Sequence, residues 1–95
     1  MTVELRLHGD AGTETLEFDA AAADRLVRPT SLELLSTVAR EEPSSIREAA
    51  RLVDRDIRQV HDDLWNLGGL VEFDRGGRSH RPLVEYERIE VGIDV

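Results

Sequence analysis

The stretch SSIREAARLVDRDIRQVHDDL, residues 44–64, decides the fold because it contains two helix-start signals in quick succession. Ser45 suits the N-cap of a helix, and Glu48 follows at the spacing of a capping box. Asp56 and Gln59 repeat this pattern further along the stretch. We therefore expect two short helices joined by a tight turn.

Asp54 marks the turn between these helices, since aspartate is one of the few residues besides glycine that tolerates a left-handed backbone. On both sides of this turn the apolar residues recur at helical intervals. The expected buried positions are Ile46, Ala49, Ala50 and Val53 in the first helix, and Ile57, Val60, Leu64 and Leu67 in the second. The pair Gly68 and Gly69 is expected to end the second helix.

Another helix is predicted before this pair and a hairpin after it. Thr30 and Glu33 have the spacing of a capping box, and Pro43 limits the helix at its far end. The expected apolar stripe of this helix is Leu32, Leu35, Val38 and Ala39. LVEF (70–73) indicates a strand, and DRGGRSHRP (74–82) indicates a hairpin tip at its Gly-Gly pair.

The N-terminal segment predicts a β-hairpin followed by a short helix. Residues 3–7 alternate between apolar and polar, GDAG (9–12) is turn-forming, and residues 16–18 continue as a second alternating strand. Asp19 then opens an alanine-rich helix, which must finish by Arg28 because a proline follows.

The element order predicts an α+β fold, a winged helix-turn-helix. We expect one domain over residues 1–95, because a chain this short has room for one core. Its parts are an added N-terminal hairpin with a short helix (1–28), a three-helix, helix-turn-helix core (29–69), and a β-hairpin wing with a C-terminal strand (70–95). The alternating residues 89–95 are the natural companion of the N-terminal hairpin, within the chain or across a dimer.

The charge composition is unusual, with a net charge of −8 and 12 basic residues that are all arginine. Excess carboxylates are typical of proteins in high salt, where a Debye length of about 3 Å at 1 M screens their repulsion. A GC-rich genome also favours arginine over lysine, and an ordinary acidic protein is the alternative. Without cysteine, a signal peptide or a long apolar run, we expect a soluble cytoplasmic protein with no membrane partner.

The third helix of the core is expected to contact DNA. Its buried stripe leaves its first turn facing outward, where Arg58 can pair with guanine and Gln59 with adenine in a major groove. The arginines of the wing suit phosphates or a minor groove. The expected DNA-binding residues are Arg55, Ile57, Arg58, Gln59, His61, Arg75, Arg78, His80 and Arg81.

Positive charge is concentrated on these two segments. Residues 74–81 carry a net charge of +2 and residues 44–61 carry +1, which leaves −11 on the rest of the chain. A neutral or positive face formed by helix and wing favours DNA, whereas an acidic face favours a protein partner.

Two long segments of the chain are RPTSLELLSTVAREEPSSIREAARLVDRDIRQVHDDL (28–64) and LVEFDRGGRSHRPLVEYERIEV (70–91). Both resemble the MarR-like winged-helix proteins of haloarchaea, a group of predicted transcriptional regulators. The resemblance implies a sequence-specific DNA-binding regulator, a repressor or antitoxin-like protein that acts as a homodimer on double-stranded DNA. It places Arg58, Gln59 and His61 at groove-facing positions.

A protein–protein interaction module without direct DNA readout is the alternative function. An enzyme is not expected, because His8, His61 and His80 lie on separate elements and no nucleophile constellation or phosphate loop is present. No cofactor is expected. Metal binding at His61, Asp62 and Asp63 is not expected either, since adjacent helical residues do not converge on one ion.

Overall fold

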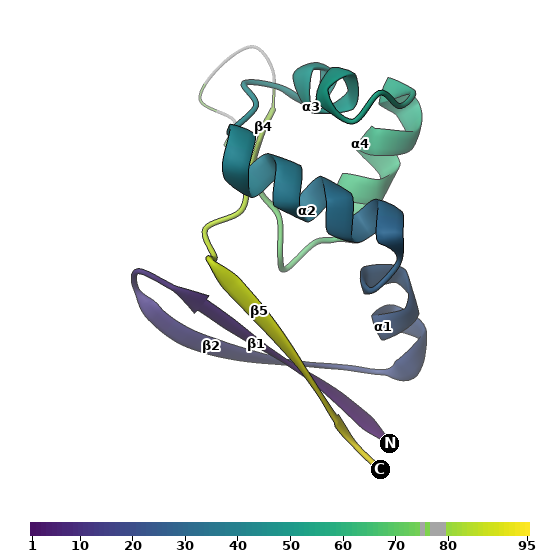
Figure 1. Cartoon of the computed structure of the whole chain (residues 1–95), viewed down its shortest axis with the longest axis vertical. Coiled ribbons are helices and arrows are strands. Elements are labelled where there is room, and N and C mark those ends of the chain that lie inside the picture. The colour runs from purple at the N-terminus through teal and green to yellow at the C-terminus, as the bar shows by residue number, and fades with distance from the viewer. Residues whose placement is uncertain (75, 77–79) are drawn as a thin grey trace.

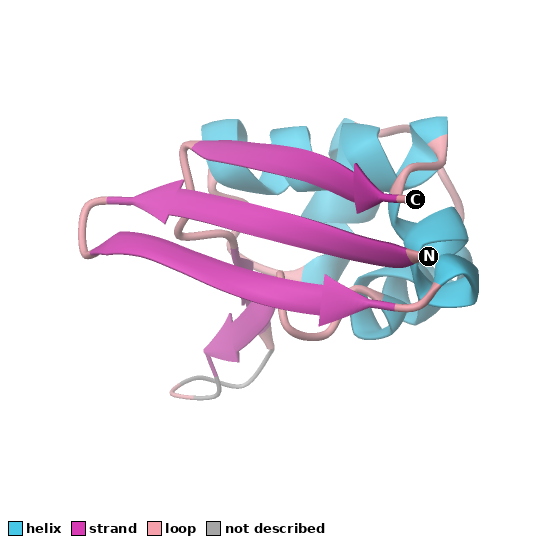
Figure 2. Ribbon diagram, turned by 90° about the horizontal axis from the view of Figure 1, so that it is seen from below, coloured by secondary structure: helices cyan, strands magenta, loops and turns pink. Residues whose placement is uncertain are grey.

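The two ends of the chain together form an antiparallel three-stranded sheet. β1 (Thr2–Gly9) lies in its centre, β2 (Gly12–Phe18) on one side and β5 (Arg88–Asp94) on the other. Figure 2 shows the three strands side by side with the helices behind them. The C-terminal strand therefore pairs with the N-terminal hairpin within the same chain. This computed structural model describes residues 1–74, 76 and 80–95.

Four helices are present among the described residues, and they lie on one side of this sheet (Figure 1). They are α1 (Ala20–Leu26), α2 (Pro29–Glu41), α3 (Ile46–Leu52) and α4 (Ile57–Asn66). After α4, β3 (Glu72–Asp74) and β4 (Arg81–Leu83) pair as a short antiparallel hairpin. The fold is α+β with antiparallel sheets. No helix in the described part of the chain is both long and apolar enough to cross a membrane.

One hydrophobic core joins the inner side of the sheet to the helices. The alternation along β1 buries Leu5 and Leu7, as the sequence predicts. Leu34 of α2 belongs to the same cluster as Val60 and Leu64 of α4, and all three are fully buried. Burial of one such side chain contributes about 1.5–3 kcal/mol. This core fixes which side of each helix faces solvent.

Two of the predicted helix starts are confirmed by side-chain caps. The Asp19 carboxylate accepts a hydrogen bond from the Ala22 amide, and Ser45 Oγ accepts one from the Glu48 amide at 3.0 Å. The return contact from the Glu48 carboxylate goes to Ser44, whose amide lies at 3.3 Å and whose hydroxyl lies at 3.0 Å. The start of α3 is therefore stabilised by side-chain hydrogen bonds of both Ser45 and Glu48.

The predicted start of α2 is wrong. Thr30 lies inside the helix, which begins at Pro29 with Arg28 at the N-cap. Proline suits the first helical position because its φ is already helical and it lacks an N–H that would be left unpaired there. The predicted stripe is also shifted, because Leu32 is 51% exposed. The buried residues are Ser31, Leu34, Leu35 and Val38.

The turn between α3 and α4 follows the prediction. Asp54 has a φ of 53°, in the left-handed region. Its amide donates to the Arg51 carbonyl at 3.2 Å, and the Arg55 amide donates to the Ala50 carbonyl at 3.0 Å. These hydrogen bonds close the end of α3, so the chain can begin α4 only a few residues later.

Asp56 is the N-cap of α4, but the predicted capping box with Gln59 is wrong. The Asp56 side chain makes no capping hydrogen bond. This helix end is exposed, so water can satisfy its first N–H groups.

The predicted strand at 70–73 is regular only in its second half. Leu70 and Val71 are buried in the core, and pairing with β4 begins at Glu72. The hairpin itself is confirmed by the antiparallel register of β3 and β4. Its predicted Gly-Gly tip includes residue 77, which lies outside the described residues.

Candidate nucleic-acid interface

Helix α4 presents one polar side to solvent. Val60 and Leu64 are fully buried beneath it, which determines the outward direction of the residues between them. The outward-facing residues of its first two turns are Arg58, Gln59, His61 and Asp62. The structure thus brings three of the expected DNA-binding residues onto one exposed side of one helix.

Arg58 and Gln59 are exposed in the first turn of α4. Neither side chain makes a hydrogen bond or an ion pair with another residue in the described part of the chain. Arginine carries five N–H donors in a planar fork, and glutamine carries both donors and an acceptor. These groups are available to an external ligand.

His61 is held in place by two neighbours on α4. Trp65 Nε1 donates to His61 Nε2 at 2.9 Å, so Nε2 must be the unprotonated ring nitrogen. The Nδ1–H group then donates to Asp62 Oδ1 at 3.2 Å. Both ring nitrogens of His61 are therefore engaged by neighbours on α4.

Trp65 connects α4 to the hairpin. Its ring stacks on Phe73 of β3, with centroids 4.3 Å apart and planes at 19°. His80, just before β4, meets the same indole edge-on at 6.3 Å. In the sequence, the i, i+4 spacing of Trp65 from His61 is the one local signal of this cluster.

Arg55 and Ile57 are less accessible than expected. Arg55 Nη2 forms an ion pair with Asp63 Oδ2 at 2.5 Å. Its Nη1 atom is buried and has no acceptor among the described residues. Ile57 is half-buried against the core. These two residues fix the start of α4 to the helix layer.

The described part of the hairpin carries two expected contact residues, His80 and Arg81, and both are exposed. Arg81 Nη2 lies 3.5 Å from Asp74 Oδ2 across the β3–β4 pair, and Asp74 Oδ1 accepts a hydrogen bond from the Gly76 amide. The expected contacts at Arg75 and Arg78 lie outside the described residues.

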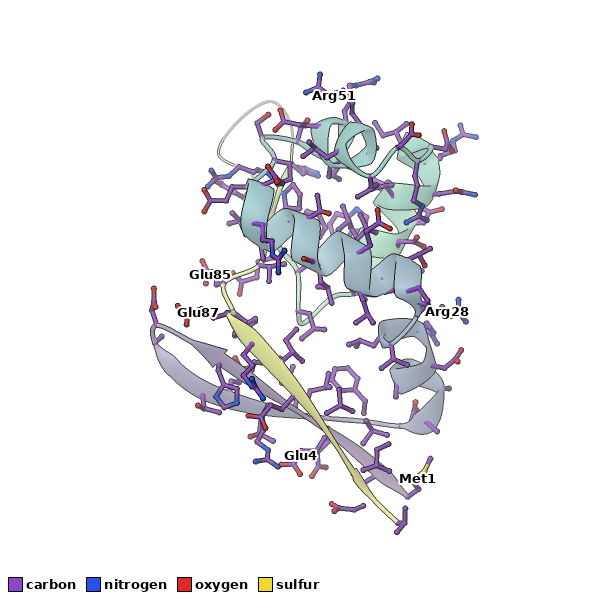
Figure 3. The ribbon with its side chains drawn as sticks, viewed as in Figure 1. Met1, Glu4, Arg28, Arg51, Glu85 and Glu87 are labelled. Carbon is purple, nitrogen blue, oxygen red and sulfur yellow. The ribbon has the colours of Figure 1, made fainter. Side chains whose placement is uncertain are left out.

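The exposed charges of α3, the turn and α4 balance one another. Arg47, Arg51 and Arg58 are exposed on these segments, against Asp54, Asp56 and Asp62. Figure 3 shows Arg51 pointing away from α3, while the labelled glutamates Glu4, Glu85 and Glu87 lie at the sheet end of the molecule. The helix face is therefore close to neutral in a chain whose net charge is −8.

Within residues 1–74, 76 and 80–95, no three His, Cys, Asp or Glu side chains gather closely enough to hold a metal ion. Comparison with protein-family models matches residues 26–91 to the HVO_A0114 family. The match spans α2, α3, α4 and the hairpin, which are the elements that build the candidate interface. No curated protein and no solved structure matches the chain.

Proposed function

The chain belongs to the HVO_A0114 family, a haloarchaeal family, and from this premise we propose that it is a sequence-specific DNA-binding transcriptional regulator. In this proposal α2, α3 and α4 serve as the core of a MarR-like winged helix-turn-helix, and β3 with β4 forms the wing. α4 enters the major groove of double-stranded DNA, and the wing contacts the phosphate backbone.

The proposal rests on one observation, the exposure of Arg58 and Gln59 and their lack of side-chain partners among the described residues. Both are exposed and without side-chain partners among the described residues, on the first turn of a helix whose other side is fully buried. A major groove about 12 Å wide admits such a helix, and the first turn reaches the base edges. Arg58 then pairs with O6 and N7 of guanine, and Gln59 with N6 and N7 of adenine.

The contacts of Trp65 support a role for the hairpin as a wing. Stacking on Phe73 and edge contact with His80 hold the hairpin beside α4. In the proposal His80 and Arg81, together with Arg75 and Arg78, reach the backbone flanking the bases that α4 reads. His61, whose two ring nitrogens are already engaged on α4, contributes only van der Waals contact, while Arg55 and Ile57 position α4.

The near-neutral face of α3 and α4 suits DNA binding in concentrated salt. Counterion release loses its driving force as salt rises, so phosphate contacts contribute little there. Affinity must then come from base contacts and shape, which a neutral face with a few exposed donors can supply.

A selection from random duplexes in molar KCl tests the proposal. We expect the intact protein to enrich a short sequence motif. The Arg78→Ala/Arg81→Ala variant should enrich the same motif, because phosphate contacts carry no sequence information. Its affinity for every duplex should fall mainly at lower salt, where phosphate contacts contribute more. Recovery of random sequence by the intact protein contradicts the proposal.

The carboxylates of the helix face favour a second candidate, an interaction module for a basic protein partner. Asp54, Asp56 and Asp62 are exposed on the turn and helix that carry Arg58, and the negative charge of Asp62 would repel a phosphate. Asp62→Asn separates the two functions, because asparagine can still accept the hydrogen bond from His61. For a DNA-binding protein this variant binds duplexes more tightly, whereas for the interaction module duplex binding is absent in both forms.

A further inference from the structure

We propose that β5 is a homodimer interface, at which it pairs antiparallel with β5 of a second copy and joins the two sheets into one. This inference concerns the sheet and does not depend on the proposed function of α4.

One edge of β5 is open. The strand order β2-β1-β5 leaves β5 hydrogen-bonded to β1 alone, and no other described strand lies on its far side. An uncovered edge exposes a row of backbone N–H and C=O groups, which proteins often protect with charged side chains, proline or a bulge. Across Arg88–Asp94 there is no proline, lysine or bulge, and the register with β1 runs without interruption. The charged residues of β5, Arg88, Glu90 and Asp94, all point to the outer side of the sheet.

The inner side of β5 is apolar and incompletely covered. Val91 lies opposite Leu5, and Ile93 lies opposite Val3, so both point to the side of the sheet that carries the core. Leu5 is 2% exposed, but Val91 is 48% exposed and Ile93 is 58% exposed. Both side chains are therefore accessible to a neighbour on the open edge.

A groove beside the start of β5 adds further apolar surface. It has a volume of about 420 Å³ and lies between α2 and residues 84–89, with Leu32, Leu35 and Ile89 among its lining residues. Leu32 is the exposed residue of α2 that departs from its predicted burial. A strand added beside β5 brings further apolar side chains to this groove.

The charges of β5 fit a second copy of the same strand in one register. In an antiparallel pair, directly opposite residues point to the same face of the sheet. A twofold axis through Val91 therefore places every residue of β5 opposite a residue of β5 in the second copy. Ile89 then meets Ile93 of the second copy, and Arg88 meets the oppositely charged Asp94. Glu90 faces Gly92, so no like charges are opposed.

The neighbouring symmetric registers are less favourable. An axis through Glu90 sets this carboxylate against its own copy, and an axis through Gly92 sets Glu90 against Asp94. Like charges directly opposite each other destabilise a strand pair. The other sheet edge, β2, is a poorer candidate because Glu14 points to its inner side, where it accepts a hydrogen bond from Tyr86.

Single cysteines test both the surface and the register, because the chain contains no cysteine of its own. A disulfide needs Cα atoms about 4.4–6.8 Å apart, which directly opposite strand residues satisfy. The variants are Val91→Cys, Ile93→Cys and, as a control of similar exposure on α3, Leu52→Cys. In the proposed register the two copies of residue 93 are about 13 Å apart along the strands.

We expect sedimentation equilibrium of the unmodified chain in molar KCl to show a dimer. Under oxidation Val91→Cys should form covalent dimers at least ~10 times faster than Ile93→Cys or Leu52→Cys. Circular dichroism checks that each variant is folded. A monomer at every concentration overturns the proposal, as does equal cross-linking at residues 91 and 93.

Discussion

The indole ring of Trp65 stacks on the phenyl ring of Phe73, with centroids 4.3 Å apart, and this contact joins α4 to the β3–β4 hairpin. Stacked aromatic pairs contribute about 0.5–1.5 kcal/mol beyond the area they bury. We expect Phe73→Leu, which keeps an apolar side chain but removes the stacked ring, to lower the free energy of unfolding by about 1 kcal/mol. Urea denaturation followed by circular dichroism measures this change.

Leu52→Ala is the control for this variant, since Leu52 is 44% exposed on α3 and is not a member of the stacked pair. It should change the free energy of unfolding by less than Phe73→Leu does. Equal losses in the two variants would show that the stacked pair adds nothing specific.

Tyr86 is expected to titrate above its ordinary pKa of 10.0. Partial burial raises the pKa of the phenol, and the hydrogen bond to Glu14 and the charge of that carboxylate raise it further. Tyr86 is the one tyrosine of the chain, so its ionisation can be followed directly by ultraviolet absorbance. Glu14→Gln keeps a hydrogen-bond acceptor but removes the charge, and it should lower the pKa of Tyr86.

This shift also predicts a change of stability with pH. The folded state binds the phenolic proton more tightly than the unfolded state, so the resulting stabilisation is fully present below pH 10.0. It is lost as the pH rises through the higher pKa of the folded protein. Identical titrations of Glu14→Gln and the unmodified chain would exclude a contribution from the Glu14 charge.

Salt should stabilise the fold. The net charge is −8, and the repulsion among carboxylates is screened as the Debye length falls from about 10 Å at 0.1 M to about 3 Å at 1 M. We expect the midpoint of thermal unfolding to rise by at least ~5 °C between these KCl concentrations. A midpoint that is unchanged or falls would contradict a fold adapted to concentrated salt.

Exchanging the charges at the two ends of β5 tests the proposed pairing of Arg88 with Asp94 of the second copy. Arg88→Asp and Asp94→Arg each oppose like charges across the twofold axis, and each should raise the dimer dissociation constant by about tenfold at low salt. Mixing the two variants restores both attractive pairs, so the mixture should form heterodimers. A mixture that dimerises no better than its components rules out this register.

Local chemistry in the sequence was sufficient for several features of the fold. The Ser45–Glu48 spacing predicts the start of α3, and Asp54 predicts the left-handed turn, because both depend on residues a few positions apart. At α2 the sequence contains two helix-start signals, Pro29 as the first helical residue and Thr30 as an N-cap, and the helix begins at Pro29. Helical spacing alone is also compatible with a buried stripe that begins at either Ser31 or Leu32. Which of the two is buried depends on how α2 packs on the rest of the core.

The candidate interface depends more on contacts between distant residues. The outward position of Arg58 follows from the buried stripe of α4 and could be predicted. The ion pair between Arg55 and Asp63 instead depends on how the turn folds back onto α4. The meeting of Trp65 with Phe73 and His80 depends on where the hairpin lies, which no local pattern encodes.

The most direct test of DNA reading by α4 is the ratio of affinities for a selected duplex and a scrambled one, measured in molar KCl. Arg58→Ala should lower this ratio by a factor corresponding to about 1–3 kcal/mol and relax the preference at one position of the motif. Arg40→Ala is the control. Arg40 is an exposed arginine in the last turn of α2, outside the helix that reads the bases in this proposal, and its removal should leave the ratio unchanged. Equal losses of affinity for both duplexes in Arg58→Ala would contradict base readout by this helix.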